Sequence, residues 1–138
     1  MVTRIRGEEM RRFIRQIIEQ LCESSAERDF RKLTAHRSFL SESHFAQQFS
    51  PDLAKQRVAT VVARVLNKQL GVSNVRASDN IAAAFPDVGF DEIANDVAEE
   101  LRVVCPQDTL QSLDGTVGNL VDVLHELLRV QGDVTKKL

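Results

Sequence analysis

The sequence predicts an all-α protein, with a helical extension over residues 1–50 and a four-helix bundle over residues 51–138. Three stretches place apolar residues at the three- and four-residue spacing of an amphipathic helix, and none alternates apolar and polar residues as a strand would. The chain has 138 residues, of which 43% are hydrophobic. A chain of this length can form one hydrophobic core with an appended arm, but it is too short for two domains that each have a core of their own.

The most regular stretch runs from Met10 to Cys22, and a helix is expected over about residues 8–23. Its apolar residues follow the i, i+3, i+4, i+7 pattern without a gap. They are Met10, Phe13, Ile14, Ile17, Ile18, Leu21 and Cys22. The opposite face is polar and partly basic, so the apolar stripe must pack either on the bundle or on another chain. The sequence leaves both arrangements open.

Residues 24–50 are less regular. Ser24-Ser25 indicates a break, and one or two short helices are expected after it. Phe45 and Phe49 lie one helical turn apart, so they are expected to share a face.

The first helix of the bundle is expected to begin at Ser50-Pro51, as N-cap and first helical residue, and to end at Gly71. It is rich in valine, so a strand over residues 58–62 is the alternative. The consecutive pairs Val61-Val62 and Val65-Leu66 favour the helix, because a strand would turn the members of each pair to opposite faces.

A loop is expected from Val72 to Pro86, with a helical turn at Ile81 to Phe85. The second helix lies between Asp87 and Val104, where the buried residues are Ile93, Val97 and Leu101, and it stops before Pro106.

A short third helix is expected around Thr109 to Leu113. Thr116 then caps the last helix. The buried stripe of that helix is Val117, Leu120, Val121, Leu124, Leu127 and Leu128.

The charge distribution argues against direct nucleic-acid binding. Residues 1–50 carry nine Lys and Arg against seven Asp and Glu, and residues 51–138 carry nine against thirteen. The concentrated basic stripe that nucleic acid needs is missing. The N-terminal arginines resemble a mitochondrial transit peptide, although Glu8 and Glu9 interrupt what should be an acid-poor segment. We expect an intracellular protein, with a weak indication of a mitochondrial address.

Metal, cofactor and catalytic sites are not indicated. Cys22 and Cys105 fit no C-x-x-C or Cys/His spacing, and His36, His44 and His125 are scattered. The sequence has no Ser/His/Asp constellation and no phosphate-binding glycine loop. No run of about 18 apolar residues predicts a membrane span. We therefore expect a protein that is not an enzyme and binds no cofactor and no metal.

Four short sequence strings occur over residues 53–130, and their order and spacing are informative. They are Gln69-Leu70-Gly71-Val72, then Val75 with Ser78-Asp79-Asn80-Ile81, then Glu99-Glu100-Leu101 before Cys105-Pro106, and last Thr116-Val117 with Asp122-Val123-Leu124. In this order they resemble the acyl carrier protein family. The resemblance implies a four-helix bundle with a long first loop, a short third helix, and a surface for partner proteins.

The family attaches phosphopantetheine to a serine in a D-S-L motif at the start of the second helix. Here no serine occurs between Ser78 and Ser112. The string from Asp87 to Ile93 is similar to the family's D-L-G-x-D-S-L and puts Glu92 at the serine position, with Asp91 as N-cap. Counting back from Pro106 without a gap instead puts Asp87 there. In both registers the position is acidic, so the resemblance implies a carrier without its prosthetic group.

Six acidic residues lie along the second helix. The family meets basic surfaces of partner proteins with this helix, so the resemblance implies that they bind a protein partner; a merely solvated face is the alternative. They are Asp87, Asp91, Glu92, Asp96, Glu99 and Glu100. The function expected is a non-enzymatic interaction or scaffold subunit on an acyl-carrier-like fold. The alternative is a helical oligomerisation or regulatory module unrelated to carriers, and homo-oligomers are compatible with both.

Overall fold

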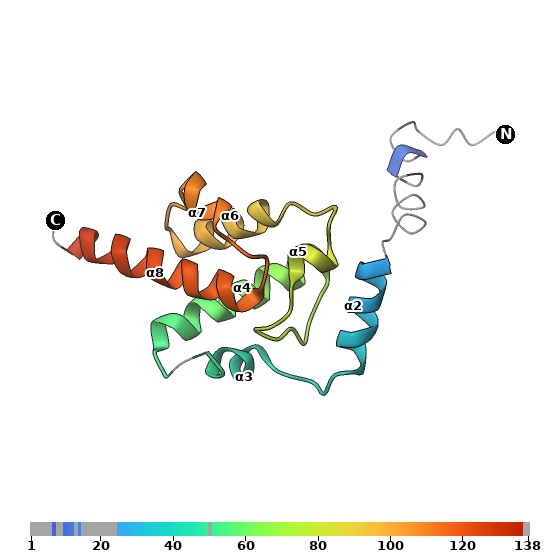
Figure 1. Ribbon diagram of the computed structural model, residues 1–138, viewed down its shortest axis with the longest axis horizontal. Helices are drawn as coiled ribbons and strands as arrows, with labels where there is room; N and C mark the ends of the chain where they lie inside the picture. The colour runs from blue at the N-terminus through green and yellow to red at the C-terminus, as the bar shows by residue number, and fades with distance from the viewer. Residues whose placement is uncertain (1–6, 8–9, 13, 15–24, 50, 137–138) are drawn as a thin grey trace.

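The computed structural model describes residues 7, 10–12, 14, 25–49 and 51–136 (Figure 1). Within these ranges the protein consists of helices and connecting loops. The one isolated backbone bridge in them joins Asn80 and Thr116. The prediction of an all-α protein is therefore confirmed.

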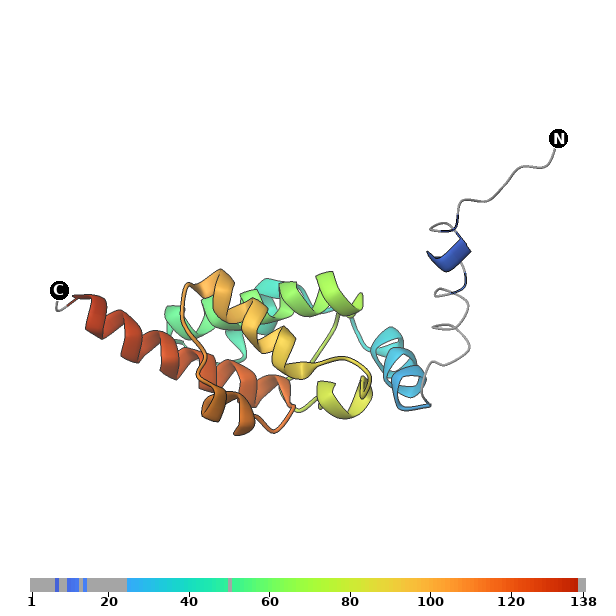
Figure 2. The ribbon, with the colours of Figure 1, turned by 90° about the horizontal axis from the view of Figure 1, so that it is seen from above.

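Seven helices have their bounds within the described residues. They are α2 (Ser25–His36), α3 (Glu42–Gln47), α4 (Leu53–Leu70), α5 (Ile81–Ala84), α6 (Phe90–Leu101), α7 (Gln107–Gln111) and α8 (Val117–Lys136). Helices α3, α6 and α8 contact α4, whereas α2 contacts α5. Figure 2 shows α6 lying across α4, with α2 at one end of the molecule beside α5. We call residues 53–136, from α4 to α8, the body.

Helix α4 begins later than the sequence suggested. Its N-cap is Asp52, whose carboxylate accepts the Ala54 amide at 2.9 Å, so the prediction of Pro51 as first helical residue is wrong. A carboxylate at the cap also interacts favourably with the helix dipole, which the hydroxyl of Ser50 could not do. Ser50 itself lies outside the described residues. Gly71 ends the helix with φ 64°, as predicted.

The core is formed by the apolar stripes of α4, α6 and α8. The helical spacing predicted for these stripes is confirmed, and the strand alternative for residues 58–62 is excluded, because these residues lie in α4. The side chains with no exposed surface include Val58, Val62, Leu66, Ile93, Val97, Leu120, Val121 and Leu124.

The segment before α4 shares this core. Phe30 of α2 meets Phe85 edge to face, with ring centroids 5.6 Å apart, and it belongs to the same buried cluster. Phe45 and Phe49 meet edge to face at 5.0 Å, so their predicted shared face is confirmed. Most of the helix predicted between Met10 and Cys22 lies outside the described residues.

The long loop between α4 and α6 is fastened to the start of α8. The Val117 and Gly118 amides donate to the carbonyls of Asp79 and Ala77, at 3.0 and 2.8 Å. The Thr116 hydroxyl accepts the Asn119 amide at 3.2 Å, which confirms Thr116 as the cap of α8. The helical turn predicted in this loop is present as α5. These bonds hold the loop in a fixed course towards α6.

Candidate protein-binding site on α6

The amino-terminal end of α6 consists of a glycine cap followed by two carboxylates. Gly89 is the N-cap, and Asp91 and Glu92 lie in the first turn. The prediction that Asp91 caps this helix is therefore wrong. Glycine supplies the extended cap backbone, and the Gly89 carbonyl accepts the Glu92 amide at 3.0 Å. Both carboxylates remain favourable here because they face the positive end of the helix dipole.

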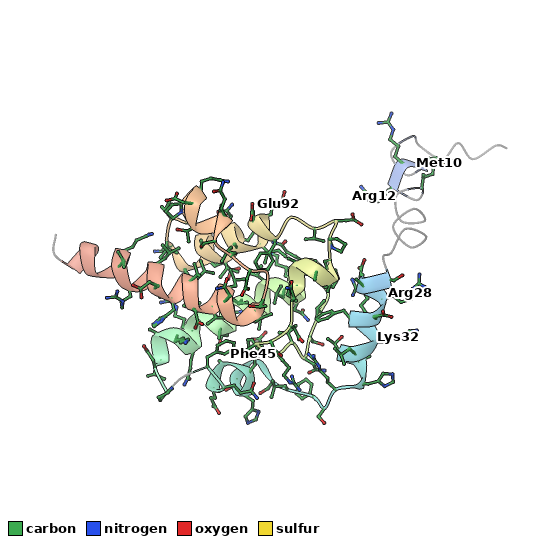
Figure 3. The ribbon with its side chains drawn as sticks, in the orientation of Figure 1. Met10, Arg12, Arg28, Lys32, Phe45 and Glu92 are labelled. Atoms are coloured by element: carbon green, nitrogen blue, oxygen red, sulfur yellow. The ribbon has the colours of Figure 1, made fainter. Side chains whose placement is uncertain are left out.

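Glu92 and Asp87 occupy different environments. Glu92 is the third residue of α6, whereas Asp87 lies in the turn before the helix, and both are exposed. A β-carbon built on Gly89 would lie 3.3 Å from Glu92 Cγ, so the Glu92 side chain folds back over the cap (Figure 3). The register that centres on Asp87 would put Gly89 inside the helix, but Gly89 lies just outside it.

Four carboxylates form a stripe along α6, which we call the acidic stripe (Glu92, Asp96, Glu99 and Glu100). Their spacing of three and four residues puts them on one side of the helix. The opposite side is buried and comprises Ile93, Ala94, Val97, Ala98 and Leu101. Asp91 points about 100° away from Glu92 and so lies outside the stripe. The structure thus separates Asp87 and Asp91 from the other four predicted residues.

The acidic stripe borders a groove between α4 and α6. The groove has a volume of about 500 Å³ and is lined by Val65, Lys68, Gln69, Asp96, Glu99, Glu100 and Arg102. The Gln69 side-chain amide donates to the Asp96 carboxylate, which anchors this part of the stripe to α4. Lys68 of α4 and Arg102, the C-cap of α6, bring positive charge to the same groove.

The contribution of α4 could not be read from the sequence. Arg102 directly follows the acidic helix in the sequence, whereas Lys68 of α4 lines the same groove from a distant part of the chain. The position of Lys68 depends on the angle at which α4 and α6 pack. Its proximity to the buried Val65 in the sequence is a weak signal, since it only places Lys68 at the border of the apolar face.

Cys105 does not provide an activated nucleophile. Burial raises the pKa of its thiol, and the nearby negative charge of Asp91 raises it further. Because the thiolate is the reactive form, both effects disfavour nucleophilic chemistry. The described residues also bring together no group of three or more His, Cys, Asp or Glu that could hold a metal ion.

Two of the three histidines, His44 and His125, contact a polar side chain. His44 Nδ1 lies 2.9 Å from Ser41 Oγ, at the cap of α3, and His125 Nε2 lies 3.3 Å from the Asp52 carboxylate. His36 is exposed at the end of α2.

None of the described helices combines the length and the apolar character that a membrane crossing needs.

Comparison of the chain with models of protein families, with curated proteins and with solved structures finds no match.

Proposed function

We propose that the protein is a non-enzymatic interaction or scaffold subunit, built on an acyl-carrier-like arrangement of helices and unable to carry phosphopantetheine. Its partner is a protein with a basic helical surface, which binds the acidic stripe of α6. The observation that carries the proposal is Glu92, a carboxylate in the first turn of the helix on which the resemblance puts the modified serine.

The order of the elements supports the carrier-like part of the proposal. The long α4 is followed by a long loop with a single helical turn, then by α6, the short α7 and the capped α8. This is the order that the resemblance implies. The hydrogen bonds from the loop to the start of α8 hold the part of the loop before α5, and α6 begins after the Gly89 cap, which puts Glu92 in its first turn.

The chemistry of attachment supports the loss of the prosthetic group. The transfer of phosphopantetheine needs a hydroxyl that attacks the pyrophosphate of coenzyme A, and a carboxylate would give at best a labile mixed anhydride. The nearest serines are Ser78 in the loop before α5 and Ser112 at the end of α7. Neither of them lies in α6.

The electrostatics of α6 support a charged protein partner. Glu92, Glu99 and Glu100 are exposed, and none of them forms an ion pair within the described ranges. Their charge is therefore available to a second molecule. Complementary charge mainly raises the association rate and selects the partner, and its effect falls as salt screens it.

Affinity capture from native cells tests the proposal. The variant Glu92→Lys/Glu99→Lys should bind the captured partner at least about tenfold more weakly than the wild type, because two attractive charges become repulsive. The matched control is Asp29→Lys/Asp108→Lys. It makes the same change in net charge on α2 and α7, and Asp108, like Glu92, lies in the first turn of its helix.

Two outcomes would count against the proposal. The first is equal recovery of partners by both variants, which would mean that α6 is merely a solvated face. The second is an adduct with the mass of one phosphopantetheinyl group on the wild-type protein after co-expression with a phosphopantetheinyl transferase. The first outcome would contradict the proposal that α6 binds a partner, and the second would contradict the proposal that the protein cannot carry phosphopantetheine.

A further inference from the structure

A second, apolar groove lies on the other side of α4. It opens between α3, α4 and the loop that follows α4, and its volume is about 270 Å³. From α4 it is lined by Ala63 and Asn67, whereas Val65, Lys68 and Gln69 line the groove beside α6. At 100° per residue, these two sets lie on opposite faces of the helix. The apolar groove is thus independent of the acidic stripe.

The apolar groove has an exposed aromatic side chain at its edge. Its apolar lining consists of Phe39, Leu40, Phe45, Ala63, Val72 and Val75. Phe45 is buried, but Phe39 is 82% exposed. Ligand pockets usually enclose about 300 to 1,000 Å³, so this groove is small for a cofactor and suits one or two anchoring side chains of a protein segment.

The chain itself carries a segment with matching chemistry. Residues 7, 10–12 and 14 are helical and extend away from the body, beyond the start of α2 (Figure 1). Met10 and Ile14 lie one turn apart on this helical arm and are 41% and 46% exposed. Figure 3 shows Met10 and Arg12 at the upper right, away from Phe45 at the lower centre of the molecule. The arm thus presents aliphatic anchors that its own body does not cover.

The charges of the arm and the apolar groove are complementary. Glu42 is the one charged residue that lines the groove, and it is exposed. Arg11 and Arg12 are exposed on the arm, next to Met10. A helix that buries Met10 and Ile14 in the groove would therefore bring its arginines to a rim that carries negative charge.

We propose that the helical arm of one copy docks into the apolar groove of a second copy, with Met10 and Ile14 packing against Phe39. Met10 and Ile14 are exposed, so they are not seated in the groove of their own chain. Phe39, which follows the carboxyl end of α2, lies about 18 Å along that helix from its amino-terminal end.

Sedimentation velocity of the full chain over a range of concentrations tests this proposal. The wild type should associate reversibly. Ile14→Asp and Phe39→Asp should each weaken association at least about tenfold, because each buries a charge in the apolar contact. Val104→Asp is the matched control, since Val104 is 72% exposed on the loop between α6 and α7 and should leave association unchanged. Thermal melts should confirm that all three variants fold.

A mixing experiment distinguishes a second copy from other occupants. Ile14→Asp retains an intact groove, and Phe39→Asp retains an intact arm, so the two variants should associate with each other although each alone is monomeric. A wild type that stays monomeric at every concentration would overturn the proposal, whether the arm binds its own groove or a different protein. Association that survives Phe39→Asp, or a mixture that stays monomeric, would overturn it equally. None of these outcomes affects the acidic stripe.

Discussion

Arg37 and Asp79 are joined by two parallel hydrogen bonds, from Nη1 to Oδ2 at 2.6 Å and from Nη2 to Oδ1 at 2.7 Å. Arg37 follows α2, and Asp79 lies in the long loop before α5, so the pair ties the extension to the body. Asp79 also accepts the Arg76 amide at 2.7 Å. Hydrogen bonding to Asp79 raises the pKa of Arg37, which therefore stays charged.

Replacing Asp79 with alanine should lower the free energy of unfolding by about 2 to 3 kcal/mol, because the Arg37 guanidinium and the Arg76 amide lose their acceptor. The Asp79 side chain is only 6% exposed, so water cannot fully replace it. Urea unfolding followed by circular dichroism measures the change. Asp29→Ala on the exposed side of α2 is the control and should cost less than about 0.5 kcal/mol. Equal costs for the two variants would contradict the structural role of the pair.

Replacing Gly115 with alanine should destabilise the protein by about 3 kcal/mol. Gly115 has φ 90°, and an added β-carbon would lie 2.6 Å from Ala82 Cβ and 2.7 Å from Asn80 Oδ1. Gly71→Ala is the matched control, because Gly71 also has a positive φ of 64° but open space around it. It should cost only about 1 kcal/mol, from the backbone alone. Thermal unfolding that ranks the two variants in the reverse order would contradict the clash.

The proposed loss of the carried group predicts a gain of function. Glu92→Ser would place a serine between Asp91 and Ile93 in the first turn of α6, and the resulting D-S-I string is similar to the family's D-S-L. Co-expressed with a phosphopantetheinyl transferase, this variant should acquire the mass of one phosphopantetheinyl group. Asp87→Ser should not, because residue 87 lies in the turn before the helix. Intact-protein mass spectrometry reads both results, and modification of Asp87→Ser alone would favour the other register.

The turn before α8 should make stability depend on pH. Asp114 Oδ1 accepts the Thr116 hydroxyl at 2.7 Å and the Thr116 amide at 2.8 Å, and these bonds lower the pKa of Asp114 from its usual 3.8. A lowered pKa stabilises the fold above 3.8, and this contribution is lost as the pH falls through the lower folded-state value.

The difference in stability between the wild type and Asp114→Ala should therefore be largest at neutral pH. It should shrink below about pH 4, as the carboxylate is protonated. Urea unfolding at pH 7 and at about pH 3 measures this difference. A difference that grows towards acid would mean that the carboxylate is not the group responsible.

The helical stripes could be predicted from the sequence because they depend on local spacing. Val58, Val62 and Leu66 recur at the period of a helix, and a single buried face follows directly from that. Helix starts were harder to predict. The sequence favoured Ser50 and Asp91 as caps, but the caps of α4 and α6 are Asp52 and Gly89, because several neighbouring residues can cap a helix and packing selects among them.

Contacts between distant residues could not be predicted. No local sequence pattern indicates that Arg37 pairs with Asp79. Phe39 and Phe45 are the same residue type six positions apart, yet Phe39 is 82% exposed and Phe45 is 3% exposed. For the predicted site, the spacing of Glu92, Asp96 and Glu99 in the sequence was enough to predict that they share one face of α6. The presence of Lys68 opposite that face required the packing of α4.

The amides of Val117 and Gly118 donate to the loop that also holds Asp79, the acceptor for Arg37. Opening of this loop must therefore disrupt the junction with α2 and the first turn of α8 together. In hydrogen–deuterium exchange, these two amides and that of Arg76 should become labelled with one common opening free energy. Segments from both halves of the chain would then open as a single cooperative unit, and a probe on the extension would report the opening of the first turn of α8.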